Sequence, residues 1–136
     1  MADTDNIFAV RIITPERVFY EGEASMIEFT TTEGEIGVYA KHIPLTTVIA
    51  PGVLTITEAG DEKKRAGVYS GFAEIRGDKV TLLAEAAEWP DEIDGERAKK
   101  AENRARTRLE QRPPNLDLVR CEIALKKALV RQHLAR

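Results

Sequence analysis

Cysteine and histidine, the residue types that most often carry catalytic or metal chemistry, are scarce in this chain of 136 residues. It has one cysteine, Cys121, and two histidines, His42 and His133. A single cysteine cannot form an internal disulfide, and two histidines without a neighbouring cysteine do not indicate a zinc site. No Ser-His-Asp arrangement and no glycine-rich phosphate loop can be assembled from the sequence. We therefore expect a protein that is not an enzyme and that requires no metal or cofactor.

Acidic side chains follow the pair Trp89-Pro90 and are the next candidates for binding chemistry. Pro90 keeps the preceding residue out of the α region, so no helix enters from the N-terminal side. Asp94 then offers a side-chain oxygen to the free backbone N–H groups at the start of a helix. Two interpretations remain open: a plain linker with a helix cap, or a hinge that carries a ligand site.

Short alternating segments precede this hinge, and turn residues separate them every 6–12 positions. No helix-length segment interrupts them, which favours an antiparallel β-sandwich or barrel over parallel βαβ units. We expect a β-sandwich domain over residues 1–88 and a helical domain over residues 89–136, an α+β fold. The expected strands are 8–13, 18–20, 24–30, 36–39, 46–49, 53–57, 66–69, 71–76 and 79–83.

After Asp94 the apolar residues recur with a helical period. Proline cannot continue a helix, so Pro113-Pro114 should end the first one, and the second should begin near Asn115 or Leu116. Two helices joined by so short a turn form an antiparallel hairpin. The expected face of the first helix is Ala98, Ala101, Ala105 and Leu109. The expected stripes of the second are Val119, Ile123, Val130 and Leu134, and beside them Leu118, Cys121, Leu125, Ala128 and Leu129.

The seam of this hairpin should be close-packed but weak. Burying a methyl group contributes roughly 0.8 kcal/mol, against about 2 kcal/mol for a leucine. The second helix also has more apolar surface than an alanine-lined partner can cover. The sandwich or another protein must cover the rest, and a permanently docked hairpin and a moving one both fit the residues.

Charge is divided unevenly along the chain. Residues 1–90 contain 8 Lys and Arg against 15 Asp and Glu, whereas residues 91–136 contain 12 against 8. The net charges of −7 and +4 are complementary, so the halves can dock on each other or meet different partners. The first residues lack a basic region and an apolar run, so we expect a soluble, cytosolic protein without a signal peptide or membrane span.

Three sequence blocks occur in order and carry a resemblance. They are ITPERVFYEGEA at 13–24, EGEIGVYAKHIPL at 33–45 continuing to Pro51-Gly52, and SGFAEI at 70–75 with VTLLAEAAE at 80–88. Together with the helical tail, they resemble the ε subunit of F-type ATP synthases over residues 8–134. This resemblance implies an antiparallel sandwich of about ten strands followed by two helices.

The resemblance also implies a role. Such a subunit is non-catalytic, lies on the central rotor stalk, binds the γ subunit and rests on the membrane c-ring. It couples rotation to catalysis, and its helices can extend, contact the α and β subunits transiently and inhibit ATP hydrolysis. It implies a peripheral position on the cytoplasmic side of the bacterial inner membrane, without direct membrane insertion.

The segment IDGERA at 93–98 matches the ATP-recognition pattern of this family. Acidic groups there can accept hydrogen bonds from adenine or ribose, and arginines can bind phosphate through two parallel hydrogen bonds. Lys127 stands where ATP-binding members have arginine. Lysine retains the positive charge but cannot form the two parallel hydrogen bonds of a guanidinium group. ATP is accordingly expected as a regulatory ligand rather than a required cofactor. The positions implied are Glu88, Ile93, Asp94, Arg97, Ala98, Arg104, Lys127 and Arg131.

Two further residues are implied as contacts with other subunits. In the family, the turn that holds Glu35 and the bend that holds His42 lie at the end of the sandwich near the c-ring and γ. From the residues alone, the simpler interpretation is that Glu35 is a solvated turn residue and His42 a packed bend residue before Ile43-Pro44.

Two other functions are alternatives to this role. A nucleic-acid binder would use the basic hairpin, but acidic residues are interleaved there and the tail has no aromatic platform, so we expect no nucleic-acid partner. A free-standing ATP sensor would close its hairpin on nucleotide and need no rotor partner.

Overall fold

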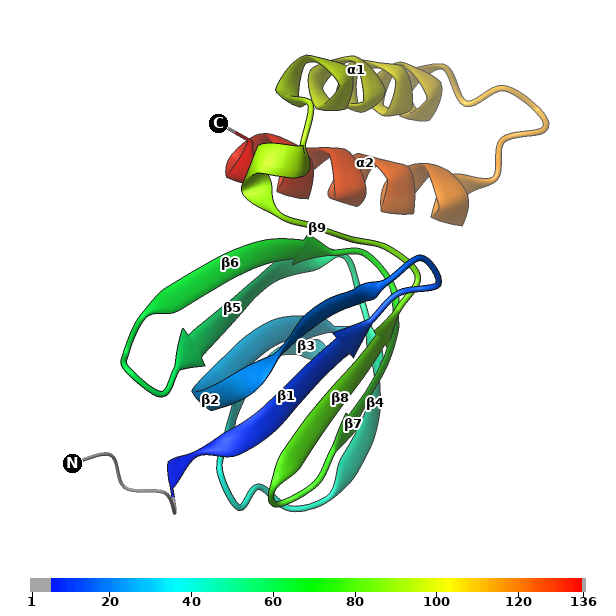
Figure 1. The fold of residues 1–136 in the computed structure, drawn as a ribbon. Helices are drawn as coiled ribbons and strands as arrows, with labels where there is room; N and C mark the ends of the chain where they lie inside the picture. The colour runs from blue at the N-terminus through cyan, green and yellow to red at the C-terminus, as the bar shows by residue number, and fades with distance from the viewer. Residues whose placement is uncertain (1–5, 136) are drawn as a thin grey trace.

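The computed structural model describes residues 6–135, which form nine strands followed by a short 3-10 turn and two helices (Figure 1). The fold class expected from the sequence is therefore confirmed. The strands are β1 (Phe8–Ile13), β2 (Val18–Thr31), β3 (Gly34–Tyr39), β4 (Leu45–Ile49), β5 (Gly52–Glu58), β6 (Lys63–Val68), β7 (Gly71–Ile75), β8 (Lys79–Ala84) and β9 (Ala87–Glu88). The turn is η2 (Pro90–Glu92), and the helices are α1 (Gly95–Gln111) and α2 (Leu118–Leu134).

The strands pair in the order β1-β8-β7-β4-β2-β5-β6-β9, with β3 beside β2 and a further pairing of β1 with β2. All these pairings are antiparallel except that of β1 with β8. The expected strands 18–20 and 24–30 are one continuous strand of 14 residues, β2. Gly22 lies within this strand, and its missing side chain leaves room for the Tyr20 ring: a Cβ there would lie 2.7 Å from the Tyr20 hydroxyl.

The core of the sandwich consists of apolar side chains that alternate with exposed ones along most strands, as the period-2 pattern predicted. The strand β6 departs from this alternation, because its last three residues are buried in succession. The aliphatic side chains at its centre are completely buried: Ile12, Ile27, Ile56, Ile75, Val80 and Leu82. This core makes the sandwich a rigid platform for the rest of the chain.

Each helix begins at an aspartate cap. The Asp94 carboxylate accepts a hydrogen bond from the Arg97 backbone N–H at 3.1 Å, and Asp117 accepts one from the Arg120 N–H at 3.1 Å. The cap at Asp94 is the one expected from the sequence, but α2 begins two to three residues later than expected. The later aspartate, not Asn115 or Leu116, satisfies the free N–H groups of the first turn.

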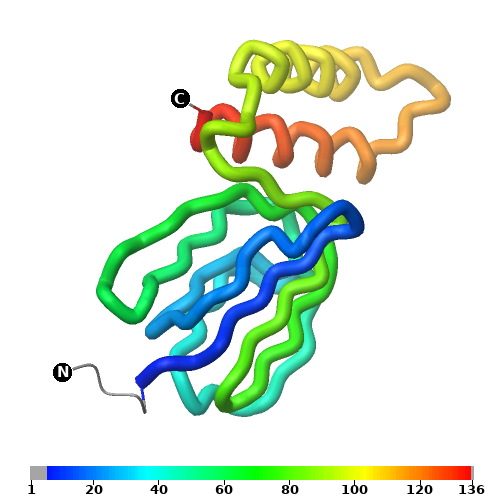
Figure 2. Tube along the Cα trace, in the orientation of Figure 1, coloured from blue at the N-terminus to red at the C-terminus, as the bar shows by residue number. Residues whose placement is uncertain are grey.

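The helical hairpin lies across one end of the sandwich (Figure 1), and the Cα trace shows α2 between the sandwich and α1 (Figure 2). The seam between the helices contains Ala98, Ala105, Cys121 and Ala128, all buried. The Cys121 thiol donates a hydrogen bond to the Ala105 carbonyl at 3.4 Å. Within residues 6–135, no helix has both the length and the apolar character required to cross a membrane.

Candidate functional site

The hairpin is joined to the sandwich by an ion pair between α2 and β9. Arg131 Nε donates to the Glu88 carboxylate at 2.7 Å, and the Arg131 guanidinium lies 4.4 Å from the centre of the Tyr69 ring. Tyr69 is fully buried, and burial followed by the nearby Glu88 carboxylate raises the pKa of its phenol. The Tyr69 ring fits beside Gly67, where a Cβ would come within van der Waals overlap of the ring and close to Leu134. The joint therefore combines one charge pair, one cation–π contact and one leucine.

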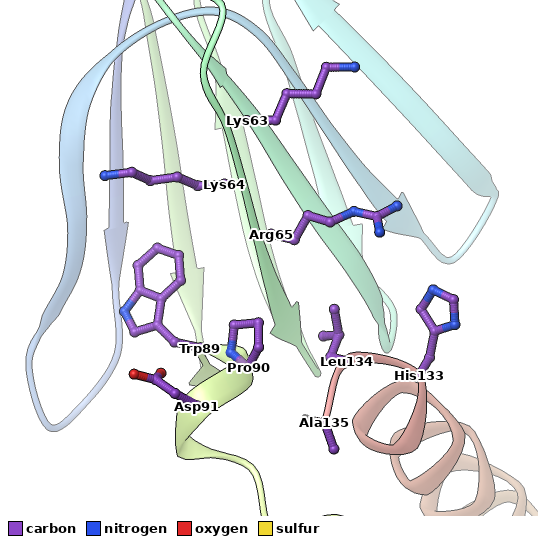
Figure 3. Close-up of a pocket in the computed structure, with 9 residues that line it drawn as sticks. All are labelled: Lys63, Lys64, Arg65, Trp89, Pro90, Asp91, His133, Leu134 and Ala135. Atoms are coloured by element: carbon purple, nitrogen blue, oxygen red, sulfur yellow. The ribbon is translucent and has the colours of Figure 1, made fainter.

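A cavity of about 730 Å³ opens beside this joint (Figure 3). Its walls are Lys63, Lys64 and Arg65 of β6, Trp89, Pro90 and Asp91 of the connection to the hairpin, and His133, Leu134 and Ala135 at the end of α2. Lys64 points to the side of Trp89, whereas Arg65 points to the side of His133. The cavity is mainly basic, so its electrostatics suit an anion better than a cation.

The structure places the residues of the implied ATP pattern in different parts of the molecule. Glu88 and Arg131 meet directly, but they bind each other. Asp94 and Arg97 meet through the backbone cap alone, while the Arg97 side chain is exposed. The bond at Asp94 is thus a helix cap, the plainer of the two interpretations.

The remaining residues of the pattern lie apart from that pair. Ile93 and Ala98 are buried. Arg104 lines a groove between the helices together with Arg108 and Arg120, and Lys127 lines a separate shallow pocket with Val119 and Ile123. Ten residues of helix separate Asp94 from Arg104, which is about 15 Å along α1. The structure therefore brings together only part of the implied nucleotide set.

The two implied subunit contacts lie at opposite ends of β3. Glu35 is exposed beside the turn from Thr31 to Gly34, which bonds to the end of β4. His42 is half-buried in the loop after β3, where the Lys41 N–H donates to the Gly77 carbonyl at 2.7 Å. The expectation that both residues share one end of the sandwich is not met, because the whole of β3 separates them.

An exposed row of apolar side chains, which sequence reasoning missed, crosses the outer face of the sheet. The strand register places Val48 opposite Phe72, Phe72 opposite Leu83, Leu83 opposite Ile13, and Ile13 opposite Val18. We call these five residues the apolar row. Four of them are 43–59% exposed, and Ile13 is half-buried. Their outward positions in alternating strands were the available signal.

The next row on the same face is polar. Thr46 lies opposite Glu74, Glu74 opposite Thr81, and Thr81 opposite Arg11, and Arg11 forms an ion pair of 3.8 Å with Glu21. Since most sheet faces turned to water are polar throughout, a continuous apolar row beside a polar one marks a contact surface.

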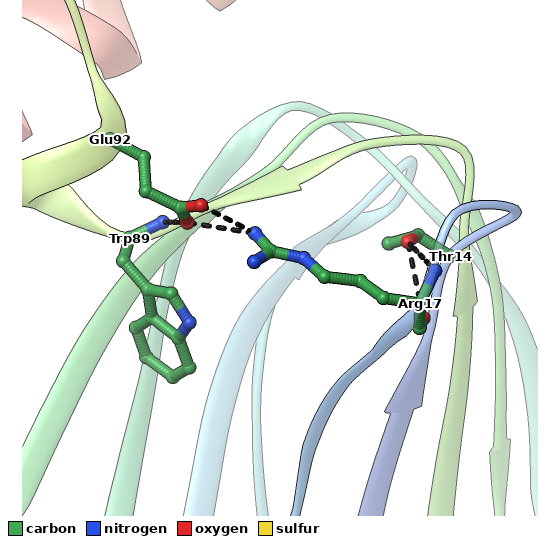
Figure 4. Close-up of polar contacts among 4 residues, drawn as sticks. All are labelled: Thr14, Arg17, Trp89 and Glu92. Carbon is green, nitrogen blue, oxygen red and sulfur yellow. Dashed lines mark hydrogen bonds and ion pairs between the residues drawn. The ribbon is translucent and has the colours of Figure 1, made fainter.

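The structure also shows a second ion pair between the sandwich and the segment that leads to the hairpin, and the sequence analysis did not predict it. Arg17 Nη2 donates to both oxygens of Glu92, at 2.8 and 2.7 Å, across 75 residues of sequence (Figure 4). The Trp89 backbone N–H donates to the same carboxylate at 2.8 Å. These bonds from Arg17 and Trp89 lower the pKa of Glu92, with the backbone bond as the larger cause.

Among the described residues, no three His, Cys, Asp or Glu side chains lie close enough together to hold a metal ion. The arrangement therefore offers three surfaces for binding: the apolar row, the basic cavity and the exposed hairpin.

Comparisons with known proteins match both parts of the chain. The family model described as ATP synthase, Delta/Epsilon chain, beta-sandwich domain matches residues 7–90, and the model of the long alpha-helix domain of the same chain matches residues 91–135. The ATP synthase epsilon chain of Caldanaerobacter subterraneus subsp. tengcongensis is 46% identical over 132 residues, which cover 96% of this chain and 95% of that one. The epsilon chain of Shouchella clausii is 46% identical over 127 residues, 93% of each chain.

Among solved structures, a chain from the Euglena gracilis mitochondrial ATP synthase, determined with OSCP, F1 and the c-ring, is similar in fold. The TM-score is 0.81 at 27% identity, and the match covers 91% of this chain and 78% of that chain.

Proposed function

This chain belongs to the ATP synthase delta/epsilon chain family, and on that premise we propose that it is a rotor-stalk subunit with two separable tasks. The sandwich attaches the subunit to γ and to the c-ring and so couples the catalytic sector to the membrane rotor. The hairpin regulates ATP hydrolysis by leaving the sandwich and obstructing rotation in that direction. The subunit itself is non-catalytic, and it sits peripherally on the cytoplasmic side of the bacterial inner membrane.

The apolar row is the observation that carries this proposal. Its five side chains, four of them between 43% and 59% exposed and Ile13 half-buried, form a continuous strip over five strands. Exposed contiguous apolar surface on a small soluble domain marks a protein interface. We assign this face to γ, a partner that remains bound as the rotor turns.

The opposite end of the sandwich suits a second contact. Tyr39, the last residue of β3, and Ile43, in the loop after it, lie on either side of His42 in the sequence and are 61% and 76% exposed. We propose that this loop rests on the c-ring, with the half-buried His42 between the two exposed side chains. Glu35, at the other end of β3, belongs in this scheme to the γ side.

The hairpin has features of a mobile regulatory element. Leu118, Val119, Ile123 and Leu129 of α2 are all more than a third exposed, although the hairpin is docked. Residues 91–136 also contain an excess of basic side chains. We propose that, when extended, these apolar and basic groups contact γ and the acidic surfaces of the α and β subunits.

ATP is proposed as a regulatory ligand at the base of the hairpin. Glu88 and Arg131, two residues of the implied pattern, already hold the hairpin closed by binding each other. A nucleotide that engaged both groups would replace this pair by a ligand bridge and retain the docked position. Titration of ATP and then ADP into Arg131→Gln, with Lys127→Gln as the comparison, tests this role: binding should be lost in the first variant and retained in the second, whose lysine lies in a separate pocket.

Binding of γ tests the proposed function most simply. The variant Phe72→Ser/Leu83→Ser should weaken the complex with γ by about 100-fold, because two anchors lose their buried apolar area. The matched control, Tyr39→Ser/Ile43→Ser, removes exposed apolar area from the proposed c-ring contact and should leave the affinity for γ unchanged. Equal affinity for the wild type and the sheet variant would exclude this face as the γ contact.

A chain that ends at Ile93 tests the regulatory task. It should assemble with the ATP synthase, retain coupling, and keep or raise the rate of ATP hydrolysis. Loss of assembly would show that the sandwich is not the attachment module.

A further inference from the structure

The cavity in Figure 3 is bordered by three successive cationic residues of β6. Lys63, Lys64 and Arg65 are all exposed. Successive side chains of a strand point to opposite faces, so Lys63 and Arg65 share one face and Lys64 takes the other. The Lys64 ammonium is engaged there, because it lies 3.6 Å from the Glu58 carboxylate and 5.9 Å from the centre of the Tyr20 ring. Two of the three cations therefore remain available on the other face.

These two cations are not neutralised by the protein itself. In the part of the chain that the structure describes, no carboxylate forms an ion pair with Lys63 or Arg65, and their cross-strand neighbours on β5 are threonines. One carboxylate, Asp91, lines the same cavity. Figure 3 shows it beside Trp89, apart from Arg65 and His133. The side of the cavity that holds Arg65 therefore attracts an anion.

The end of α2 supplies a further donor on that side. His133 is exposed in the last turn of α2, and its ring lies on the same side of the cavity as Arg65 (Figure 3). Imidazole has an N–H donor in either protonation state. A guanidinium presents two parallel N–H groups, which match two oxygens of a phosphate. Donors from two separate elements thus border one space.

The remaining walls are apolar and fixed in place. Trp89 is stacked on Phe19, with 4.3 Å between ring centres and 14° between planes. Leu134 is 7% exposed and lies close to Gly67, where a Cβ would be 3.4 Å from Leu134 Cδ1. Pro90 lies between Trp89 and Leu134 in the view of Figure 3. The cavity therefore combines a cationic side with a preformed apolar side.

The size of the cavity favours an organic ligand over an inorganic ion. Its volume of about 730 Å³ lies within the range of roughly 300–1,000 Å³ that is typical of small-molecule sites. A free phosphate ion beside Arg65 and His133 would leave the apolar walls in contact with water. A phosphate ester could place its organic part against these walls and gain the free energy of burying them.

We propose that this cavity binds a small organic phosphate ester. The phosphate group lies between Arg65 and His133, with Lys63 adding positive charge, and the organic part lies against the apolar walls. None of the eight positions implied for ATP lines this cavity, so it is a separate site. It goes beyond the proposed function and does not depend on it: an unchanged affinity for γ in the sheet variant would refute the γ contact and leave this site unaffected.

The single tryptophan reports binding in the isolated full-length chain, because Trp89 forms part of the cavity wall. Titration with phenyl phosphate should change the Trp89 fluorescence saturably at millimolar concentration or below. Arg65→Gln should weaken binding about tenfold, because the charge-assisted hydrogen bonds to the phosphate are lost. The matched control Arg104→Gln makes the same charge change in the separate groove between the helices and should bind as the wild type does.

Vesicles of phosphatidylcholine with phosphatidic acid distinguish the two sources of a phosphate ester. Sedimentation of the chain with these vesicles, lost in Arg65→Gln, would identify the ligand as a lipid headgroup. Binding of phenyl phosphate without binding to vesicles would identify it as a soluble ester. The site is refuted if phenyl phosphate produces no saturable change, or if Arg65→Gln and Arg104→Gln weaken binding equally. It is also refuted if phenol, which lacks the charge, or inorganic phosphate, which lacks the organic part, binds as tightly as phenyl phosphate.

Discussion

The sandwich and the hairpin bury different kinds of side chain. The sandwich core holds isoleucine, leucine and valine at 0–1% exposure, whereas the seam of the hairpin holds chiefly alanine. Each large aliphatic residue contributes roughly 1.5–3 kcal/mol when fully buried, against about 0.8 kcal/mol for a methyl group. The comparison teaches that one chain contains a platform stabilised by its own core and an appendage held by a few specific contacts.

Polar contacts compensate for the small side chains in the hairpin. Glu102 accepts hydrogen bonds from Lys99 at 3.2 Å and Arg106 at 2.6 Å on its own helix, and from Gln132 of α2 at 2.7 Å. The joint to the sandwich depends on Arg131 and Glu88. Directional contacts of this kind can break and re-form without disturbing a core, which is what a moving element requires.

The largest effect should come from the core of the sandwich. Ile56→Ala should lower the free energy of unfolding by about 2–5 kcal/mol, because it leaves a cavity in a fully buried position. Urea unfolding followed by circular dichroism measures this loss. Leu83→Ala removes a similar group from the exposed face of the same sheet and should cost much less. Similar losses in both variants would contradict the rigid-core description.

A smaller and local effect should follow from Leu134→Ala at the contact of α2. Leu134 is 7% exposed, so the change should destabilise docking of the hairpin by about 2 kcal/mol. Amide exchange should accelerate in α1 and α2 and remain unchanged in β7 and β8. Leu129→Ala, at a 41% exposed position of the same helix, serves as the control. Faster exchange throughout the sandwich would argue against separable parts.

The cap of α1 should contribute less. Asp94→Ala removes the bond to the Arg97 N–H and should cost about 1 kcal/mol of hairpin stability, whereas Asp94→Asn should retain most of it. Asp91→Ala, which changes charge nearby without touching the cap, should have little effect. Helix content and exchange of the first turn of α1 measure the difference. An equal loss in the Asn variant would assign the effect to charge instead of capping.

The smallest expected effect on the stability of the hairpin at neutral pH concerns Glu102, and this effect increases as the pH falls. Hydrogen bonds from Gln132, then Arg106 and Lys99, lower the pKa of Glu102 from 4.5 to about 2. A carboxyl with a lowered folded-state pKa stabilises the fold above its unfolded pKa and loses that contribution as the pH falls through the folded value. The hairpin should therefore loosen between about pH 4.5 and pH 2.

Glu102→Gln supplies the control for this pH dependence. It should already lack the ionised form at pH 7 and show a flatter acid profile of hairpin exchange than the wild type. Identical acid profiles in the two proteins would exclude Glu102 as the titrating group.

Most of the fold was predictable from the sequence because its signals are local. Alternation identified the strands, Asp94 identified the start of α1, and Pro113 identified its end. The start of α2 was misplaced because Asn115 and Asp117 both suit a cap, and only the packing of the loop selects between them.

The candidate site was less predictable because its contacts join distant residues. Arg17 and Glu92 are 75 positions apart, and Glu88 and Arg131 are 43 apart. Family resemblance grouped Glu88 with Arg131 as ligand groups, whereas the structure shows them bound to each other. The apolar row likewise exists only once the strand register places Phe72 beside Leu83.

Residue-resolved amide exchange of the isolated full-length chain tests the central comparison most directly. The account predicts two classes of opening: α1 and α2 exchange through a local opening of lower free energy, while β2, β5 and β8 exchange only on global unfolding. The turn Pro90–Glu92 should exchange with the sandwich. A single free energy of opening for helices and strands would contradict the account, because the hairpin would then be an integral part of the platform.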